Sequence, residues 1–234
     1  MSPYITECPY CGNRLRKRAP KLDRNGRITE RVSRRPSAPS LPRLRRGEIP
    51  GIRHESRPYA AITLVALGFL GTLIWRLGGL DPLNLVILGH LRSQWWRPFT
   101  APFIYDNVGY AVVALSIVAL FGSLLERRHG PVVMLGLLLI GGVGGMALAG
   151  SVSSAIILGG NGAGLTLLAA WAVPDLLALL GKRDYEGDLA GTAVLGAVLA
   201  LMPLVDPQAS WVTAGLGVLA GLVLGYLLAK IHPA

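Results

Sequence analysis

Residues 131–174 form a run of 44 residues without one charged side chain. A helix needs about 20 apolar residues to cross the hydrocarbon core of a bilayer, so this run holds two spans and the turn between them. Three glycines and Asn161 supply the turn, in the order Gly159-Gly160-Asn161-Gly162. The run therefore predicts two membrane helices, the second from Gly162 to Leu180.

The composition of the chain divides it into two domains. Of its 234 residues 52% are hydrophobic and only 15% are charged, which is typical of a membrane protein. Residues 1–57 contain 15 Lys and Arg against 5 Asp and Glu, whereas the charges of the remaining residues cancel. We predict a basic tail over residues 1–57, mostly disordered, and a membrane domain over residues 58–231. No secretory signal peptide is expected, because the first apolar run begins after residue 57 and is long enough to span.

The two cysteines, Cys8 and Cys11, lie three positions apart in the tail. Cys-x-x-Cys-Gly is the shape of one zinc-ribbon knuckle, but structural zinc takes four ligands and the chain has no second cysteine pair. Two interpretations stay open. The pair consists of reduced thiols, or it binds zinc with ligands shared between two chains. No other cofactor is predicted.

The apolar segments after the tail predict six membrane spans. Their expected bounds are 58–75, 108–125, 131–150, 162–180, 189–205 and 207–229. A shorter apolar piece, residues 83–91, cannot cross a bilayer and suits an interfacial helix. The basic residues of the loops lie mainly on the side of the tail, so the positive-inside rule predicts that both termini are cytoplasmic. An integral protein of the cell membrane is the expected localisation.

The tail's expected partner is the membrane surface. Arg14, Arg16, Lys17 and Arg18 form a basic cluster. Each such charge contributes about 1 kcal/mol to the binding free energy for a membrane surface with anionic lipid. Nucleic acid is not a favoured partner, because the tail has neither a recognisable nucleic-acid-binding motif nor aromatic residues interleaved with its charges.

Several short motifs follow one another in the membrane domain. They are Trp96-Arg97; Gly122, Glu126 and Gly130 at spacings of four; the loop Gly159-Gly160-Asn161-Gly162; and Gly217 with Gly221 in the last span. Glycines four apart allow helices to approach closely, and Glu126 can accept hydrogen bonds from a neighbouring segment. Taken in order, the motifs resemble those of rhomboid intramembrane serine proteases over about residues 58–229. The resemblance implies an all-α bundle of six transmembrane helices.

The resemblance also implies where catalytic residues should stand. Rhomboid proteases use a serine at the start of the fourth helix and a histidine in the sixth. Here Asn161 occupies the serine position and Ala214 the histidine position, with Thr213 as the nearest polar alternative. Tyr105, Tyr110 and Ala114 stand where assisting His, His and Asn are usual. All four histidines of the chain, His54, His90, His129 and His232, lie outside the predicted spans. No catalytic residue is therefore predicted.

Three functional hypotheses follow from this pattern. The first is a pseudoprotease that binds transmembrane segments of client or partner proteins without cleaving them. The alternatives are an active serine protease with relocated catalytic residues, and a membrane anchor for the Cys8–Cys11 tail. We further expect Gly217, Gly221 and Gly225 to face the fourth helix, and Asn161 to hydrogen-bond its own loop or water.

Overall fold

The computed structural model describes residues 57–78, 82–89, 94–153, 155–182 and 187–231. Nearly all of the predicted tail lies outside these ranges, including Cys8, Cys11 and His54, and so does His90. The predictions made for these residues stay predictions.

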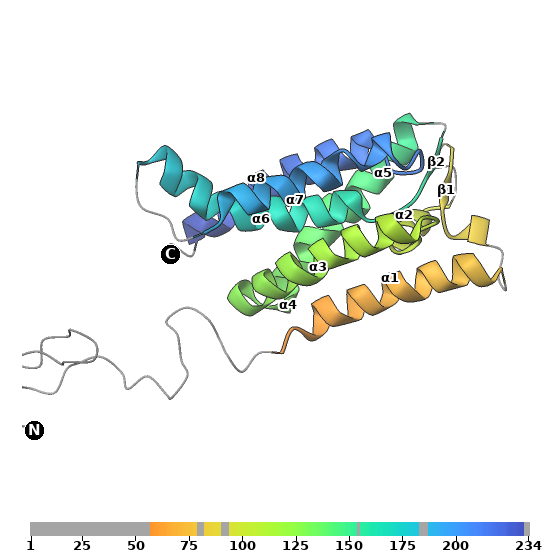
Figure 1. The fold of residues 1–234 in the computed structure, drawn as a ribbon, viewed down its shortest axis with the longest axis horizontal. Helices are drawn as coiled ribbons and strands as arrows, with labels where there is room; N and C mark the ends of the chain where they lie inside the picture. Colours follow the sequence, from red (N-terminus) through yellow and green to blue (C-terminus); the bar gives the residue numbers. More distant parts are fainter. Residues whose placement is uncertain (1–56, 79–81, 90–93, 154, 183–186, 232–234) are drawn as a thin grey trace, which may run out of the picture. The chain divides into compact units, whose positions relative to one another are not determined.

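The described residues contain five helical stretches long and apolar enough to cross a membrane. These are α1 (Tyr59–Leu77), α3 (Val108–His129), the stretch Pro131–Val152, α6 (Asn161–Leu180) and α8 (Trp211–Ile231). The stretch Pro131–Val152 comprises α4 (Pro131–Leu137), the π-helical segment η3 (Leu138–Val143) and α5 (Gly144–Val152). The helices run between two ends (Figure 1). We call the end that carries the short β-sheet described below the sheet end. We call the opposite end the basic end, because it carries Arg57, Arg127, Arg128, Lys182 and Lys230.

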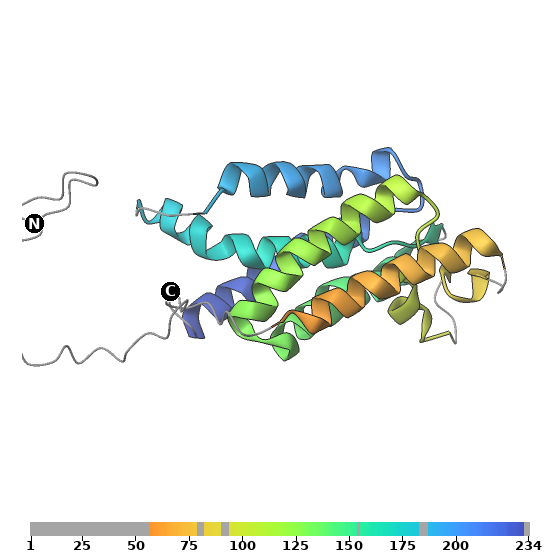
Figure 2. The ribbon, with the colours of Figure 1, turned by 60° about the horizontal axis from the view of Figure 1, so that its bottom comes forward.

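The fifth predicted span is shorter than expected. Its helix, α7 (Leu189–Ala200), is followed by a 3-10 turn, η4 (Met202–Leu204), instead of continuing to Val205. The reason is Pro203, whose nitrogen carries no hydrogen to donate to the carbonyl of Leu199 and whose ring would clash with it. At 12 residues, α7 does not meet the length of a full membrane crossing, although it runs beside α6 (Figure 2).

The interfacial helix predicted over residues 83–91 is wrong. In its place are a 3-10 turn, η1 (Pro82–Asn84), and a short strand, β1 (Ile87–Leu88). This strand pairs antiparallel with β2 (Ile156–Ile157), with Ile87 opposite Ile157. Strand pairing supplies the backbone partners that the helix would have supplied, and it buries Ile87 and Ile157. The sheet lies near two short helices, α2 (Arg97–Thr100) and η2 (Ala101–Phe103) (Figure 1).

The predicted role of Glu126 is confirmed. Helix α1 has no side-chain cap of its own, and the buried carboxylate of Glu126 accepts hydrogen bonds from Ala60 N at 3.0 Å and Ala61 N at 2.8 Å. A carboxylate at a helix N-terminus satisfies free N–H groups and interacts favourably with the helix dipole. Gly130 ends α3 at a φ of 90°, which a side chain would strain. The end of α3 therefore fixes the beginning of α1.

Helix α6 packs against α3, η3, α7 and α8. The predicted glycine stripe is confirmed. A Cβ atom added at Gly217, Gly221 or Gly225 would lie within 3 Å of backbone atoms of α6. On another side of α6, Gly141 and Gly142 of η3 lie against Thr166 and Ala163. These contacts leave the first half of α6 buried almost all round.

Asp106 ties together the loops at the sheet end. Its carboxylate accepts hydrogen bonds from Trp75 Nε1 at 2.6 Å and from Gln208 Nε2 at 3.3 Å. Trp75 belongs to α1, and Gln208 to the loop before α8. The bonds connect the end of the first span to the beginning of the last, and so help to position the loop that opens α6.

Candidate functional site

The loop that opens α6 is held from two sides at the sheet end. Gly159 N donates to the carbonyl of Ala101 at 2.9 Å, and Leu158 N donates to the carbonyl of Gln208 at 3.2 Å. Gly159 has a φ of 90°, and a Cβ atom there would collide with the ring of Tyr110. This position needs glycine for both reasons, because the backbone is left-handed and the ring occupies the space of a side chain.

Asn161 is the first residue of α6 and is completely buried. Its Nδ2 donates to Ser210 O at 3.1 Å. Its Oδ1 accepts from Gly162 N at 2.9 Å and from Thr213 Oγ1 at 2.8 Å. The predicted bond within its own loop is confirmed, but the prediction overlooked the bonds to Ser210, directly before α8, and to Thr213 in its first turn. Asn161 therefore joins α6 to α8.

Thr213 is the side chain of α8 that contacts Asn161, and it too is completely buried. Its hydroxyl also lies 2.7 Å from the carbonyl of Ser210, so two acceptors share one proton. Ala214 is buried beside it but has no polar side-chain atom. A sequence signal for Thr213 existed. Residue 213 lies four positions before Gly217 and extends the stripe of α8 that faces α6 by one turn.

Two tyrosines occupy the N–H groups that open α6. Gly160 N donates to the hydroxyl of Tyr105 at 3.1 Å, and Asn161 N donates to the hydroxyl of Tyr110 at 3.1 Å. Their rings meet edge to face, with centroids 5.1 Å apart. Burial raises the pKa of Tyr105 well above its usual value, so its phenol stays neutral. Sequence reasoning had noted both tyrosines only as replacements, not as hydrogen-bond partners of the loop.

The groups gathered around Asn161 are amide, hydroxyl and phenol. The hydroxyl of Thr213 faces an amide oxygen, which accepts a hydrogen bond but is too weak a base to take the proton. Within the described ranges the single histidine is His129, which ends α3 at the basic end. The described geometry provides a hydrogen-bonded joint between two helices.

Trp96 and Arg97 lie at the sheet end, and neither is among the described hydrogen-bond partners of Asn161. Trp96 Nε1 donates to the carbonyl of Asn84 at 3.4 Å, and the hydroxyl of Thr100 donates to the carbonyl of Leu85 at 2.6 Å. Arg97 opens α2 and is 6% exposed, and its Nε has no partner among the described residues. This pair therefore belongs to the segment that places β1 against β2, rather than to the Asn161 joint.

The family model of the Rhomboid domain matches residues 92–231, which is more than half of the chain. This chain belongs to the rhomboid family. It is also similar to RHOMBOID-like protein 9, chloroplastic, from Arabidopsis thaliana, with 21% identity over 143 residues. That match covers 60% of this chain but 33% of the relative, so the chain spans about a third of the relative's length.

Most motif residues of this rhomboid protein lie toward one of the two ends of the bundle. Gly159, Gly162 and Gly217 lie around the joint at the sheet end, whereas Glu126 and Gly130 lie at the basic end. Gly122 lies between them, where a Cβ atom would be 3.5 Å from that of Ala61. No cluster of three or more potential metal ligands exists within the described part of this rhomboid protein.

Proposed function

We propose that this rhomboid-family membrane protein binds transmembrane segments of other membrane proteins without cleaving them. The observation that carries the proposal is the bond between Asn161 Oδ1 and Thr213 Oγ1 at 2.8 Å. The bond supports the proposal because Asn161, which the resemblance aligns with the nucleophilic serine, carries an amide, and the hydroxyl beside it donates to that amide. The tyrosine hydroxyls on Gly160 N and Asn161 N add support, because they occupy donors that could otherwise stabilise an oxyanion.

The proposal includes an orientation. The basic end carries Arg57, Arg127, Arg128, Lys182 and Lys230, and we assign it to the cytoplasmic side by the positive-inside rule. The Asn161 joint then lies toward the outer side. Clients are transmembrane helices with polar or small residues, which find hydrogen-bond partners and close packing in a bundle rather than in lipid. We assign the protein to the cell membrane.

A cleavage assay on a model transmembrane substrate tests the proposal. The wild type, Asn161→Ser, Asn161→Ser/Ala214→His and Asn161→Ser/Thr213→His are compared in proteoliposomes. We expect no cleavage by the wild type or by Asn161→Ser, because neither has a base beside residue 161. Cleavage by the wild type, or its labelling by a serine-directed activity probe, would contradict the proposal and favour relocated catalytic residues.

Crosslinking in membranes tests the binding half of the proposal. Photoreactive residues replace exposed side chains of the spans in the full-length protein, and the transmembrane partners crosslinked to them are identified. The same experiment on protein lacking residues 1–50 separates capture by the membrane domain from capture by the tail. Capture that is lost with the tail would support the anchor hypothesis instead.

A further inference from the structure

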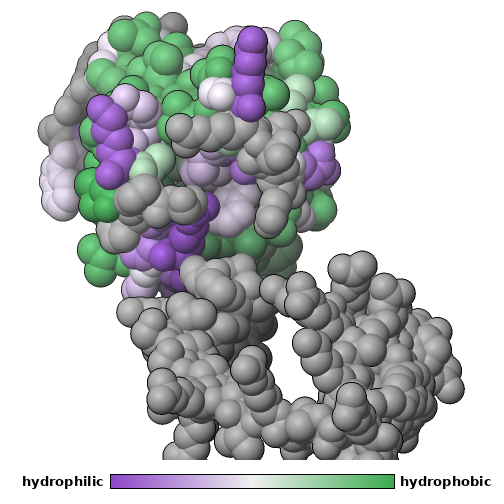
Figure 3. Space-filling model, turned by 90° about the vertical axis from the view of Figure 1, so that its left-hand side faces the viewer, coloured by the Kyte–Doolittle hydropathy of each residue, from purple (hydrophilic) through white to green (hydrophobic). Residues whose placement is uncertain are grey.

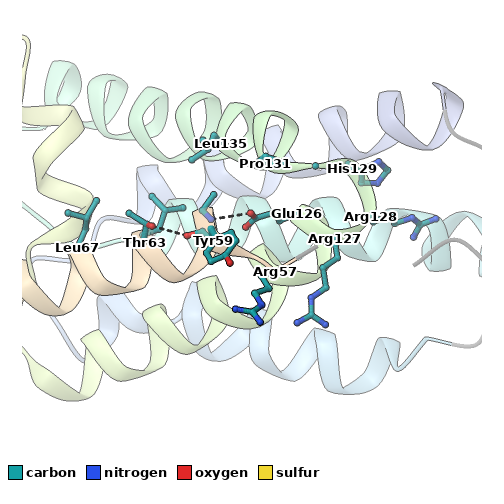
Figure 4. Close-up of a pocket in the computed structure, with 13 residues that line it drawn as sticks. Arg57, Tyr59, Thr63, Leu67, Glu126, Arg127, Arg128, His129, Pro131 and Leu135 are labelled. Atoms are coloured by element: carbon teal, nitrogen blue, oxygen red, sulfur yellow. Dashed lines mark hydrogen bonds between the residues drawn. The ribbon is translucent and has the colours of Figure 1, made fainter. Parts of the chain in front are cut away.

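A cleft of about 1070 Å³ opens at the basic end between α1, the end of α3 and the beginning of α4. Its apolar lining includes Leu64 and Leu67 of α1 and Leu135 of α4 (Figure 4). Leu67 is 44% exposed and Leu135 is 37% exposed, so the described helices leave both partly uncovered. The cleft therefore offers an apolar surface that continues along the membrane-spanning part of two helices.

The mouth of this cleft is basic. Arg57 lies two residues before the first residue of α1, and Arg127 lies in the last turn of α3. Figure 4 shows their guanidinium groups pointing the same way. Arg128 also lines the cleft, but its guanidinium lies 5.7 Å from the ring centroid of Trp171 on α6. Figure 3 looks onto this end and shows hydrophilic side chains between apolar ones.

Among the described residues that line the cleft, no carboxylate is free to balance Arg57 and Arg127. Among the described residues that line it, Glu126 is the single carboxylate. Glu126 is buried, and its two oxygens accept hydrogen bonds from Ala60 N and Ala61 N. Two like charges at one mouth repel each other, and an anion between them would relieve the repulsion. As far as the described residues define it, the cleft thus combines a cationic mouth that has no free carboxylate with an apolar wall.

We propose that this cleft binds one anionic glycerophospholipid. The phosphate lies between Arg57 and Arg127, and one acyl chain lies along Leu64, Leu67 and Leu135. Charge complementarity selects the headgroup, because basic pockets between membrane helices bind anionic lipid headgroups. The apolar wall selects a lipid over a soluble phosphate, which has nothing to place there. Arg57 is the last residue of the predicted tail, whereas the other residues of the site belong to the membrane domain. The proposal does not rest on client binding.

Photolabelling with lipids of defined headgroup tests the site. The full chain in nanodiscs of phosphatidylcholine is exposed to phosphatidylglycerol with a diazirine in one acyl chain, or to phosphatidylcholine with the same chain. Adducts are mapped to peptides by mass spectrometry, which separates the cleft from the tail. We expect phosphatidylglycerol to label the peptides of Leu64, Leu67 and Leu135 and phosphatidylcholine to label them only at background level.

A matched pair of double variants tests the assignment of the headgroup site. Arg57→Gln/Arg127→Gln should raise the half-saturating concentration of phosphatidylglycerol by about 30-fold, at about 1 kcal/mol per lost charge. Lys182→Gln/Lys230→Gln removes the same charge at the same end and should leave labelling of the cleft unchanged.

Three results would overturn the proposal. Equal labelling of the cleft by both lipids in the wild type would remove the headgroup preference, and this comparison needs no variant to fold. An equal loss in both double variants would mean a general charge effect. Competition by glycerol 3-phosphate at concentrations matching the lipid would mean an anion site without a role for the acyl chain.

Discussion

The hydroxyl of Thr213 donates to the side-chain oxygen of Asn161 at 2.8 Å, and both side chains are completely buried. The bond joins the first turns of α6 and α8, whose sequences are separated by α7 and its loops. A bond between buried polar groups stabilises a fold modestly, but breaking it leaves the remaining partner unsatisfied.

Asn161→Ala should therefore lower the free energy of unfolding by about 1–3 kcal/mol, since it leaves the hydroxyl of Thr213 and the carbonyl of Ser210 with fewer partners. Thr213→Val should cost less, about 1 kcal/mol, because Asn161 keeps its bonds to Gly162 and Ser210. Thermal unfolding in detergent measures both. Ser151→Ala, which removes an exposed hydroxyl bonded within α5, is the control. Strictly additive effects in the double variant would contradict a direct interaction.

Glu126→Ala should loosen the beginning of α1, because Ala60 N and Ala61 N lose their acceptors. Loss of such a cap typically costs about 0.5–2 kcal/mol. Glu126→Gln keeps one acceptor oxygen and should fall between the wild type and Glu126→Ala. Hydrogen exchange over α1 measures the change. Protection equal to that of the wild type in Glu126→Ala would mean that this cap does not hold α1.

Gly221→Leu should separate α8 from α6 and reduce the yield of folded, monodisperse protein in detergent. A Cβ atom at this position would lie 2.5 Å from the carbonyl oxygen of Thr166. Gly215→Leu is the matched control on the same helix, because a Cβ atom there meets nothing within 4 Å. If both variants behave like the wild type, the packing of the stripe against α6 is not needed for folding.

Tyr105 should make the fold less stable as the pH rises into the alkaline range. Burial raises the pKa of its phenol above the unfolded value of about 10, so the folded state keeps a proton that the unfolded state releases. Its contribution is complete below pH 10 and is lost as the pH rises further. Denaturant unfolding at several alkaline pH values should show this decline, and Tyr105→Phe should make it shallower. An identical slope in the variant would contradict the assignment.

A reporter fused after Ala234 tests the number of crossings. Although α7 is short, α8 ends at the basic end together with α3, which requires an even number of passages if the tail is also on that side. We expect the reporter to be cytoplasmic. A reporter signal from the outer side would mean that α7 does not return the chain across the bilayer.

Much of this arrangement could be predicted because its causes are local in sequence. Charge-free runs located the long helices, and the spacing of Gly217, Gly221 and Gly225 predicted the contact with α6. The pairing of Ile87 with Ile157 was missed because it joins segments 70 residues apart, and neither is long enough to show a strand pattern. The length of α7 was missed because a hydropathy profile does not register that Pro203 lacks a backbone N–H. A helix cannot continue through that residue without losing a hydrogen bond.

The joint at Asn161 was only half predictable. Its position and its bond to Gly162 follow from the loop motif, but the partner in α8 depends on how that helix is rotated. Aligning the last span by its glycines pointed to Ala214, whereas the contact with Asn161 comes from Thr213, one residue earlier. Motif spacing identifies equivalent backbone positions. The side chain that faces α6 is identified instead by continuing the four-residue glycine stripe of α8 back to residue 213.

The enclosure of α6 has a consequence for how the protein is made. From Asn161 to Ala170 every residue is buried, so this stretch has almost no contact with lipid in the finished molecule. During synthesis, however, α6 enters the bilayer before α8 exists, and Asn161 then has neither Ser210 nor Thr213 to bond. The side-chain amide of Asn161 gains these two hydrogen bonds only when α8 has been inserted. A chain that ends before α8 would leave the amide facing hydrocarbon without them.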